Sequence, residues 1–383
     1  MKKNNNGDGS SPSPKSNPNP QDIPPSNPNA THSKFILDQS NPWVNNGNPI
    51  WLASKITFIR NVEKFQFPHK LPIERKKHLL ELVSNAVLNQ ATGLKTPRLI
   101  KGDEIGSLEK EFLFEHFLST TSYNQSQETE GFILDESGEF IATLNLGDHI
   151  HLSLLNCNGE LEKAWSRLMK VETALGKTIN YSFSPKFGFL TADPTQCGTA
   201  MVVSLYLQLS GLIHLGTIDD VIQNLIDDSL SITGIQGSPS EIIGDVLVVQ
   251  NRYTLGVTEE NIIASMHSFV SKVLIEEQSA RATLKNKQDD TFKDQVSRAF
   301  GILTHSYKLD AVEVLNALSL LKLGLECGFI TGSDCAKINE LFFNCRRAHL
   351  LGHFKQQKIN QDEIAHLRSD YIHHAFDPLK LTL

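Results

Sequence analysis

Cysteine is scarce in this chain of 383 residues. The five cysteines are scattered, odd in number, and never spaced as CxxC. This distribution indicates neither a disulfide framework nor the usual spacing of a zinc site. We therefore expect reduced thiols, as in a cytoplasmic protein, and no bound metal.

Long apolar runs are lacking as well. Apolar residues make up 39% of the chain and the mean hydropathy is -0.23. No stretch approaches the roughly 18 consecutive apolar residues that a membrane-spanning helix needs. The N-terminus has no apolar segment of the kind found in secretory signal peptides. These features predict a soluble, cytoplasmic protein.

The chain also has no excess of positive charge. It carries 36 Lys and Arg against 43 Asp and Glu, which gives a net charge of -7 at pH 7 and a pI near 6.1. Such a balance provides no overall attraction to nucleic acid or to anionic lipid. A role in nucleic-acid binding or at a membrane surface is therefore disfavoured.

Residues 1–33 contain little that could join a core. They hold many Asn, Ser and Pro residues and one large aliphatic residue, Ile23. Such a composition cannot bury enough apolar surface to offset the entropy of ordering the chain. The segment is predicted to be a disordered tail, and folded sequence is expected from near Phe35, in a domain of residues 34–288.

Strand and helix patterns follow one another between about residue 131 and residue 287. Strands are predicted at 132–135, 140–146, 149–154, 178–184, 187–191, 199–209, 231–234 and 245–254, and helices at 159–175, 218–230 and 259–287. The order lacks the regular strand–helix–strand repetition of a parallel sheet. It therefore predicts an α+β fold around a mostly antiparallel sheet.

Only helical periods remain after residue 288. Helices are predicted at 291–303, 311–327, 334–345 and 362–374, with no strand pattern between them. The pattern predicts a small all-α domain over residues 289–383.

Several blocks, in order along the chain, resemble those of the ATP:guanido phosphotransferases. Ala53-Ser-Lys-Ile-Thr-Phe-Ile-Arg-Asn61, followed by Phe67-Pro68, is similar to the family's opening SSRVRLARN…FP. The family's EEDH, FGYLTxCPTNxGT, LG and SNQVTLG blocks are matched by Asp148-His149, residues 187–199, Ile243-Gly-Asp245 and residues 251–256. The helical C-terminal region makes the chain similar to the bacterial protein-arginine kinases of the McsB type.

This resemblance implies an antiparallel-sheet catalytic domain flanked by helices, ATP as phosphoryl donor, and arginine side chains of proteins as acceptors. In such enzymes the phosphorylated arginine can mark proteins for an ATP-dependent protease. The chemistry needs carboxylates that orient the guanidinium and accept its proton. It also needs cations that hold the γ-phosphoryl group in line.

The family's catalytic residues are replaced in this sequence. By the resemblance, the Glu that handles the acceptor guanidinium falls on Gly147, the thiol on Asp193 and the second acidic residue on Ser238. Cys197 lies beyond the thiol position and is interpreted as an inert apolar residue. Loss of a general base alone reduces a rate by about 10²- to 10⁴-fold, so catalysis by the family's mechanism is not expected.

The cations that grip phosphate are largely replaced too. The resemblance places the family's phosphate-binding arginines at Lys55, Thr57, His151, Val202 and Thr233. Lys55, His151 and the neighbouring His149 are then the remnants of a nucleotide site. Each lost charge-assisted contact costs about 1.5–3 kcal/mol. Three losses approach the roughly 4–8 kcal/mol of a millimolar-to-micromolar nucleotide site, so ATP binding in the family's mode is expected to be weak or absent.

Other acidic residues leave an enzyme alternative open. Asp148 and Asp193 would form a new carboxylate pair, and Glu241 would take the second acidic role if the loop alignment shifts by three residues. In this alternative the chain is a divergent kinase that transfers the γ-phosphoryl group of Mg-ATP to protein arginines, with Lys55 and His149 holding the nucleotide. Acids close to turns are more often caps or solvated groups, which favours the first interpretation.

The predicted C-terminal helices carry a row of possible metal ligands. Cys345, His349 and His353 recur every four residues, but the row spans about 12 Å, too far for one ion to touch all three. We interpret the histidines as surface or helix-terminal side chains. The family's phosphoarginine-binding motif Arg-Asp-x-x-Arg aligns with residues 364–368 and keeps only Arg368, so regulation by that ligand is not expected.

The sequence therefore predicts a kinase fold without its chemistry. The favoured interpretation is a cytoplasmic pseudokinase of the protein-arginine kinase family that binds or regulates other proteins. No cofactor is expected unless the enzyme alternative holds. The partner is a protein of unknown identity, and the resemblance implies a possible homodimer through the helical C-terminal domain.

Overall fold

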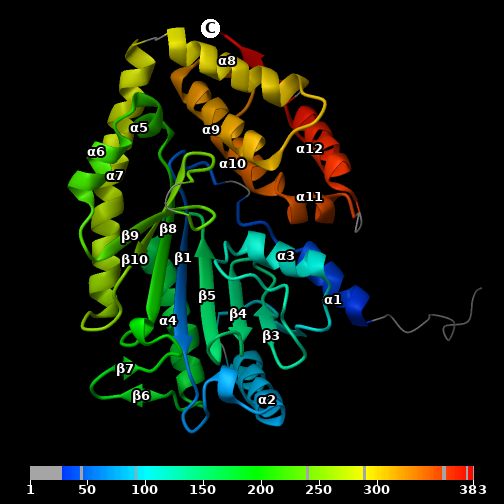
Figure 1. Ribbon diagram of the computed structural model, residues 1–383, viewed down its shortest axis with the longest axis vertical. Coiled ribbons are helices and arrows are strands. Elements are labelled where there is room, and N and C mark those ends of the chain that lie inside the picture. Colours follow the sequence, from blue (N-terminus) through cyan, green and yellow to red (C-terminus); the bar gives the residue numbers. More distant parts are fainter. Residues whose placement is uncertain are drawn as a thin grey trace, which may run out of the picture.

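An eight-stranded antiparallel sheet forms the centre of the computed structural model (Figure 1). Its strands, in spatial order, are β2 (Arg98–Lys101), β3 (Gly131–Leu134), β4 (Phe140–Leu144), β5 (Ile150–Asn156), β1 (Trp51–Arg60), β8 (Met201–Gln208), β10 (Val246–Asn251) and β9 (Leu230–Gly234). The structure describes residues 28–43, 46–90, 93–238, 241–287, 290–355, 359–376 and 378–382.

One face of the sheet is apolar and packs against helices. These helices are α2 (Ile73–Gln90), α4 (Leu161–Gly176) and α7 (Glu259–Lys287). Alternate residues of the central strands, such as Phe58, Leu152 and Val203, join the helices in one buried cluster. Since successive strand residues point to opposite faces, the residues between them face the other way and form the surface on which the predicted site lies.

The C-terminal helices cover part of this second face (Figure 1). They are α8 (Asp290–His305), α9 (Ala311–Cys327), α10 (Cys335–Asn344), α11 (Arg347–His353) and α12 (Gln361–Ala375). Apolar side chains of α8, α9, α10 and α12 share a buried cluster with Ala53, Tyr206 and Val248 of the sheet. The helical region and the sheet are therefore joined by a common core.

Two more helices lie on the same side, near the β2 edge. α1 (Pro28–Leu37) and α3 (Ser107–His116) form a third cluster with α11, in which Ile36, Phe112 and Leu350 are buried. The turn that ends α3 reaches over the central strands. Leu118 in this turn is buried and has a positive φ of 47°.

The remaining elements are short. α5 (Ser210–Leu215) and α6 (Ile218–Leu225) connect β8 to β9, and the hairpin of β6 (Phe183–Ser184) and β7 (Gly188–Phe189) extends from the lower end of the sheet (Figure 1). Single 3₁₀ turns occur at Pro68–Lys70 and Pro194–Gln196. β11 (Ile330–Thr331) pairs with β12 (Lys380–Leu381).

The predicted α+β fold with an antiparallel sheet and a helical C-terminal region is confirmed, but several segments need correction. The strands predicted at 178–184 and 187–191 shrink to the two-residue strands β6 and β7. Pro185 lacks an amide hydrogen and Gly188 has a positive φ of 69°, so the pairing cannot extend through the turn. The predicted all-α domain also contains the short β11–β12 pair, which closes its C-terminal end.

Helix boundaries also differ from the predictions. The helix predicted at 218–230 ends at Leu225, because Ile226 is extended and Asp227 accepts a hydrogen bond from the Ser229 amide in a local turn. α1 begins at Pro28, inside the predicted tail, since Ile36 anchors the helix in the core. Residues 1–27 of that tail lie outside the described residues.

The predicted domain boundary at 288 and 289 also lies outside the described residues and stays a prediction. α7 ends just before it and α8 begins just after it. Among the described residues, no helix is long and apolar enough to cross a bilayer.

Candidate functional site

The strand register places all predicted phosphate-binding positions on one face of the sheet. Thr57 lies opposite Val202, and His151 lies opposite Ile59, two residues further along the same strand. Thr233 lies opposite Val248, which lies opposite Tyr206, so Thr233 is on the same face. All the predicted positions are half-buried on the side away from the apolar cluster of Phe58. The resemblance therefore identified a surface that the structure brings together.

Lys55, the one permanent cation among these positions, is already engaged. Its Nζ donates a hydrogen bond to the backbone carbonyl of Leu118 at 3.2 Å, and the Tyr206 hydroxyl donates to the same oxygen at 3.1 Å. Burial lowers the pKa of Lys55 from 10.5 to about 8. Lys55, which the sequence predicted as a phosphate contact, thus donates a hydrogen bond to the turn that ends α3.

Neutral groups fill the centre of this face. The Thr57 and Ser153 hydroxyls form a hydrogen bond at 2.8 Å across β1 and β5. Val202 beside Thr57 offers no polar atom, and Thr233 lies on the edge strand β9. The two positions nearest the middle of the sheet therefore contribute no charge for a triphosphate.

Asp148 is the centre of a buried polar cluster. Its Oδ1 accepts hydrogen bonds at 2.6 Å from the Asn61 side chain and from the Ala192 amide, and its Oδ2 lies 3.4 Å from His151 Nε2. Burial raises the pKa of Asp148, but the hydrogen bonds from His151, Asn61 and Ala192 outweigh it and hold the pKa below its usual value. Asp148 is an ionised group whose oxygens are already bound.

Asp193 lies on the loop that Asp148 holds, but it is exposed and has a local role. Its Oδ1 accepts from the amide and the hydroxyl of Thr195, at 3.0 Å and 2.7 Å, and caps the turn Pro194–Gln196. The Thr191 hydroxyl donates to the Asp193 carbonyl and lies 3.4 Å from Cys197 Sγ. This cap matches the structural interpretation of the acid.

His149, by contrast, is buried directly before the interior strand β5. Its Nδ1 accepts from the Val62 amide at 2.9 Å and its Nε2 donates to the Gln66 carbonyl at 2.8 Å. Burial lowers the pKa of His149, which favours the neutral ring. Both nitrogens are used by the backbone, so this geometry gives His149 no free atom for a nucleotide.

The other two catalytic positions lie in separate loops. Gly147 follows β4 with a φ of +82°, a conformation that glycine adopts far more readily than glutamate. Ser238 follows β9, where its carbonyl accepts from the Gly234 amide at 2.8 Å. Glu241 is exposed beyond the same loop. The structure thus brings Gly147 and Asp193 to either side of the Asp148 cluster and leaves Ser238 and Glu241 at the β9 edge.

The C-terminal candidates are engaged within the helical region, and the predicted row on one helix is broken, because α10 ends at Asn344 and α11 begins at Arg347. His349 is buried and not at the surface as predicted. Cys345 is fully buried, and burial raises its pKa to about 12. His349 Nδ1 lies 3.0 Å from a Glu115 oxygen, and the His353 ring packs on Tyr371. Across the described ranges, no three His, Cys, Asp or Glu side chains are arranged to hold a metal ion. Arg368 is buried and donates to the carbonyls of Cys345 and Leu309, both at 2.8 Å.

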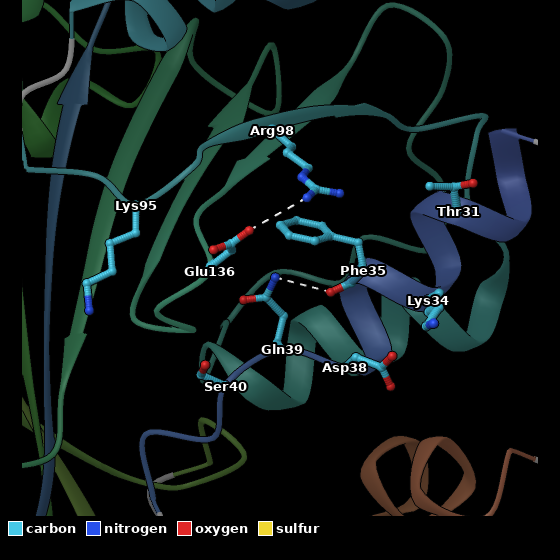
Figure 2. Close-up of a pocket in the computed structure, with 9 residues that line it drawn as sticks. All are labelled: Thr31, Lys34, Phe35, Asp38, Gln39, Ser40, Lys95, Arg98 and Glu136. Atoms are coloured by element: carbon cyan, nitrogen blue, oxygen red, sulfur yellow. Dashed lines mark hydrogen bonds and ion pairs between the residues drawn. The ribbon is translucent and has the colours of Figure 1, made fainter.

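A groove of about 550 Å³ beside α1 was not predicted from the sequence (Figure 2). Arg98 lies over the Phe35 ring at 4.3 Å and pairs with Glu136 at 3.6 Å. None of the predicted site residues lines it. The groove is therefore separate from the sheet face described above.

Leu118 is the functional residue that sequence reasoning missed. Its contribution to the site is a backbone carbonyl, and every residue type carries one. Only its position on a turn that folds over β1 and β8 brings it to Lys55. No signal in the sequence could have found it.

Comparison with known proteins gives the class first. Residues 78–280 match the family described as ATP:guanido phosphotransferase, C-terminal catalytic domain. The crystal structure of a lombricine kinase is similar in fold, with a TM-score of 0.55 and 17% identity over 65% of this chain and 71% of that one. The chain belongs to the ATP:guanido phosphotransferase family.

The residues after this catalytic domain and the curated relatives show to which branch of the family the chain belongs. Residues 289–381 match the C-terminal domain of the protein-arginine kinase McsB. A protein-arginine kinase of Halothermothrix orenii is 32% identical over 80% of this chain and 88% of its own length. One from Chlamydia pneumoniae is 30% identical over 85% of this chain and 91% of its own length. The chain is thus a member of the protein-arginine kinase branch.

Proposed function

We propose that this chain is a catalytically inactive protein-arginine kinase homologue that binds or regulates other proteins. The observation that carries the proposal is the contact between Lys55 Nζ and the Leu118 carbonyl on the predicted phosphate face. The remaining central positions of that face are a hydroxyl pair and a valine. The proposal includes the cytoplasmic location expected from the sequence.

The residues present do not fit Mg-ATP in the family's mode. A triphosphate carries several negative charges and needs paired cations or backbone amides in place. Lys55 is the one permanent cation among the predicted positions, and a single ammonium group cannot neutralise that charge, even with the N–H donors that Leu118 does not use. The hydroxyl pair of Thr57 and Ser153 does not supply the cations that are replaced at Thr57 and Val202.

The acceptor side supports the same proposal. A base for the guanidinium needs a carboxylate with a free oxygen near its usual pKa or above it. The Asp148 oxygens accept bonds from Asn61, Ala192 and His151, and Asp193 caps a turn. The alternative of a divergent kinase would have to use Asp148 oxygens that already accept these bonds, or the Oδ2 of Asp193, which the cap does not use.

Calorimetry with ATP and magnesium tests the proposal. The purified full-length chain should give no saturable heat at nucleotide concentrations up to about 1 mM, which corresponds to less than about 4 kcal/mol of binding. The Bacillus cereus protein named as a protein-arginine kinase, 30% identical to this chain, serves as the comparison. Saturable micromolar binding that is lost in Lys55→Ala would contradict the proposal and support the divergent kinase.

A further inference from the structure

Large apolar side chains are exposed together at the lower end of the sheet. Phe183 and Phe187 of the β6–β7 hairpin are 59% and 44% exposed, and Tyr253 and Leu255, which follow β10, are each 49% exposed. Phe183 and Leu255 line one groove, which shows that the two segments are neighbours. We call these four residues the apolar patch. Exposed apolar groups gathered in this way mark interaction surfaces.

Close backbone packing fixes the two segments that carry the patch. The Gly198 carbonyl accepts from the Phe189 amide at 2.8 Å, and the Thr254 carbonyl accepts from the Thr199 amide at 2.9 Å. A Cβ atom on Gly198 would lie 2.1 Å from the Thr254 oxygen, so only glycine permits this contact. The apolar patch is therefore held in place before any partner binds, which reduces the entropy cost of binding.

The groove beside the patch is acidic at one end. It has a volume of about 440 Å³ and runs from Phe183 and Leu255 to Glu259 and Glu260 at the start of α7. Glu259 faces inward and lies 3.7 Å from the Arg60 guanidinium. Glu260 is exposed, and within the described part of the chain it forms no ion pair. A carboxylate is therefore available to a basic group that enters the groove.

A buried guanidinium lies behind the wall of the same groove. Arg60 is buried, and its guanidinium carbon lies 3.6 Å from the centre of the Phe189 ring, which lines the groove. Glu172 and Glu259 balance the positive charge of Arg60, with carboxylate oxygens 2.7 Å and 3.7 Å from its guanidinium nitrogens. The groove wall thus combines an aromatic ring and carboxylates, the chemistry that recognises a basic side chain.

We propose that the apolar patch and this groove bind a segment of a partner protein that carries aliphatic side chains beside an arginine or lysine. The aliphatic side chains would cover Phe183, Phe187 and Leu255, and the basic group would pair with Glu260. This proposal rests on the protein-binding role proposed above. It places the partner beside the loop of Asp193, because the Thr254 hydroxyl donates to the Cys197 carbonyl at 2.8 Å.

Charge favours such a partner over a second copy of this chain. The chain has a net charge of -7, and the open end of the groove is acidic. Lys186, at the other end, lies over the Phe187 ring at 5.1 Å. A basic segment is attracted to Glu260 by both the local charge and the overall charge.

Fluorescence anisotropy with a labelled synthetic peptide of alternating leucine and arginine tests the proposal. The full chain should bind this probe saturably, with a dissociation constant below about 100 µM in about 150 mM salt. The double variant Phe183→Ser, Phe187→Ser should weaken binding about tenfold or more, and Glu260→Gln about threefold. A peptide with glutamate in place of arginine should bind about tenfold more weakly or not at all.

Ile275→Ser is the matched control, because Ile275 on α7 is 65% exposed and lies outside the groove. It should leave binding unchanged, and circular dichroism should show that all variants are folded. The proposal is overturned if the peptide does not bind, if the double variant binds it as the unchanged chain does, or if Ile275→Ser weakens it equally. It is also overturned if sedimentation shows a dimer that the double variant converts to monomers. A phosphoryl-transfer assay tests the proposed function separately, because transfer does not depend on the patch. Transfer by this chain would contradict the proposed inactivity, whereas missing peptide binding would contradict only the proposal for the patch.

Discussion

The Lys55 ammonium group donates its hydrogen bond to the Leu118 carbonyl across 3.2 Å, joining the central strand β1 to the end of α3. Burial lowers the pKa of this lysine to about 8, against 10.5 in the unfolded chain. Below pH 8 the folded state therefore bears the cost of a buried charge. The lysine thus joins β1 to the end of α3 at the cost of burying its charge.

Lys55→Met should raise the free energy of unfolding at pH 7 by about 1–2 kcal/mol, after allowance for partial exposure and the lost hydrogen bond. The folded pKa is depressed, so the penalty in the unchanged chain falls as the pH rises from 8 to 10.5 and is absent above it. The advantage of the variant should shrink over the same range. Urea unfolding between pH 6 and pH 10 measures this, with the exposed Lys163→Met as a control that shows no such trend.

Asp148→Ala should destabilise the fold by about 2–4 kcal/mol, because it leaves Asn61 and the Ala192 amide without their acceptor. Asp148→Asn keeps one oxygen and should cost less. Asp193→Ala should cost about 1 kcal/mol, the value of a helix cap. Since the folded pKa of Asp148 is lowered, its contribution is present above the unfolded pKa and is lost as the pH falls through the folded pKa.

Urea titrations at pH 7 and at pH 3 check this order. Equal stability of Asp148→Ala and the unchanged chain at pH 7 would show that the hydrogen-bonded cluster does not hold the Asp193 loop.

Arg368→Ala should cost about 2–4 kcal/mol, because the buried guanidinium holds the carbonyls of Cys345 and Leu309. Arg347→Ala, whose side chain is 45% exposed, should cost less than about 1 kcal/mol. Thermal unfolding compares the two. Free phosphoarginine should bind neither the unchanged chain nor the variants in calorimetry, and binding that disappears with Arg368→Ala would refute the structural role.

Gly198→Ala should destabilise the chain by about 3 kcal/mol or more, because its Cβ would lie 2.1 Å from the Thr254 oxygen at a φ of +113°. Gly256→Ala is the matched variant, with a φ of +78° but open space around the new Cβ. It should cost about 1 kcal/mol. Similar midpoints for the two variants in thermal unfolding would argue against the tight seam beneath the apolar patch.

Sequence patterns predicted the fold class because apolar strand segments and helical periods follow one another without the strand–helix–strand repetition of a parallel sheet. The family resemblance placed Lys55, Thr57 and Val202 among the phosphate-binding positions, and the strand register of the structure brings them to one face. The patterns could not predict contacts between residues that are far apart in the sequence. The Leu118 carbonyl carries no side-chain signal, and the ring nitrogens of His149 meet amide and carbonyl groups far from it in sequence.

The ends of helices and strands were also predicted less accurately than the elements themselves. Asp227 ends α6 early through its bond to the Ser229 amide, and Pro185 limits the β6–β7 hairpin. The sequence pattern placed Phe183 and Phe187 in strands. Burial would then be expected for both, because an apolar residue on a strand is usually buried. In the structure both side chains are exposed, on a short hairpin that packs through Gly188 and Gly198.

The most direct test of the central claim is transfer of radiolabel from the γ-phosphate of ATP. The purified chain is incubated with labelled ATP, magnesium and an arginine-rich protein, beside the Bacillus cereus homologue. The account predicts no acid-labile label on the protein with this chain, even at high enzyme concentration. Label on arginine that grows with time and with the amount of this chain would contradict it.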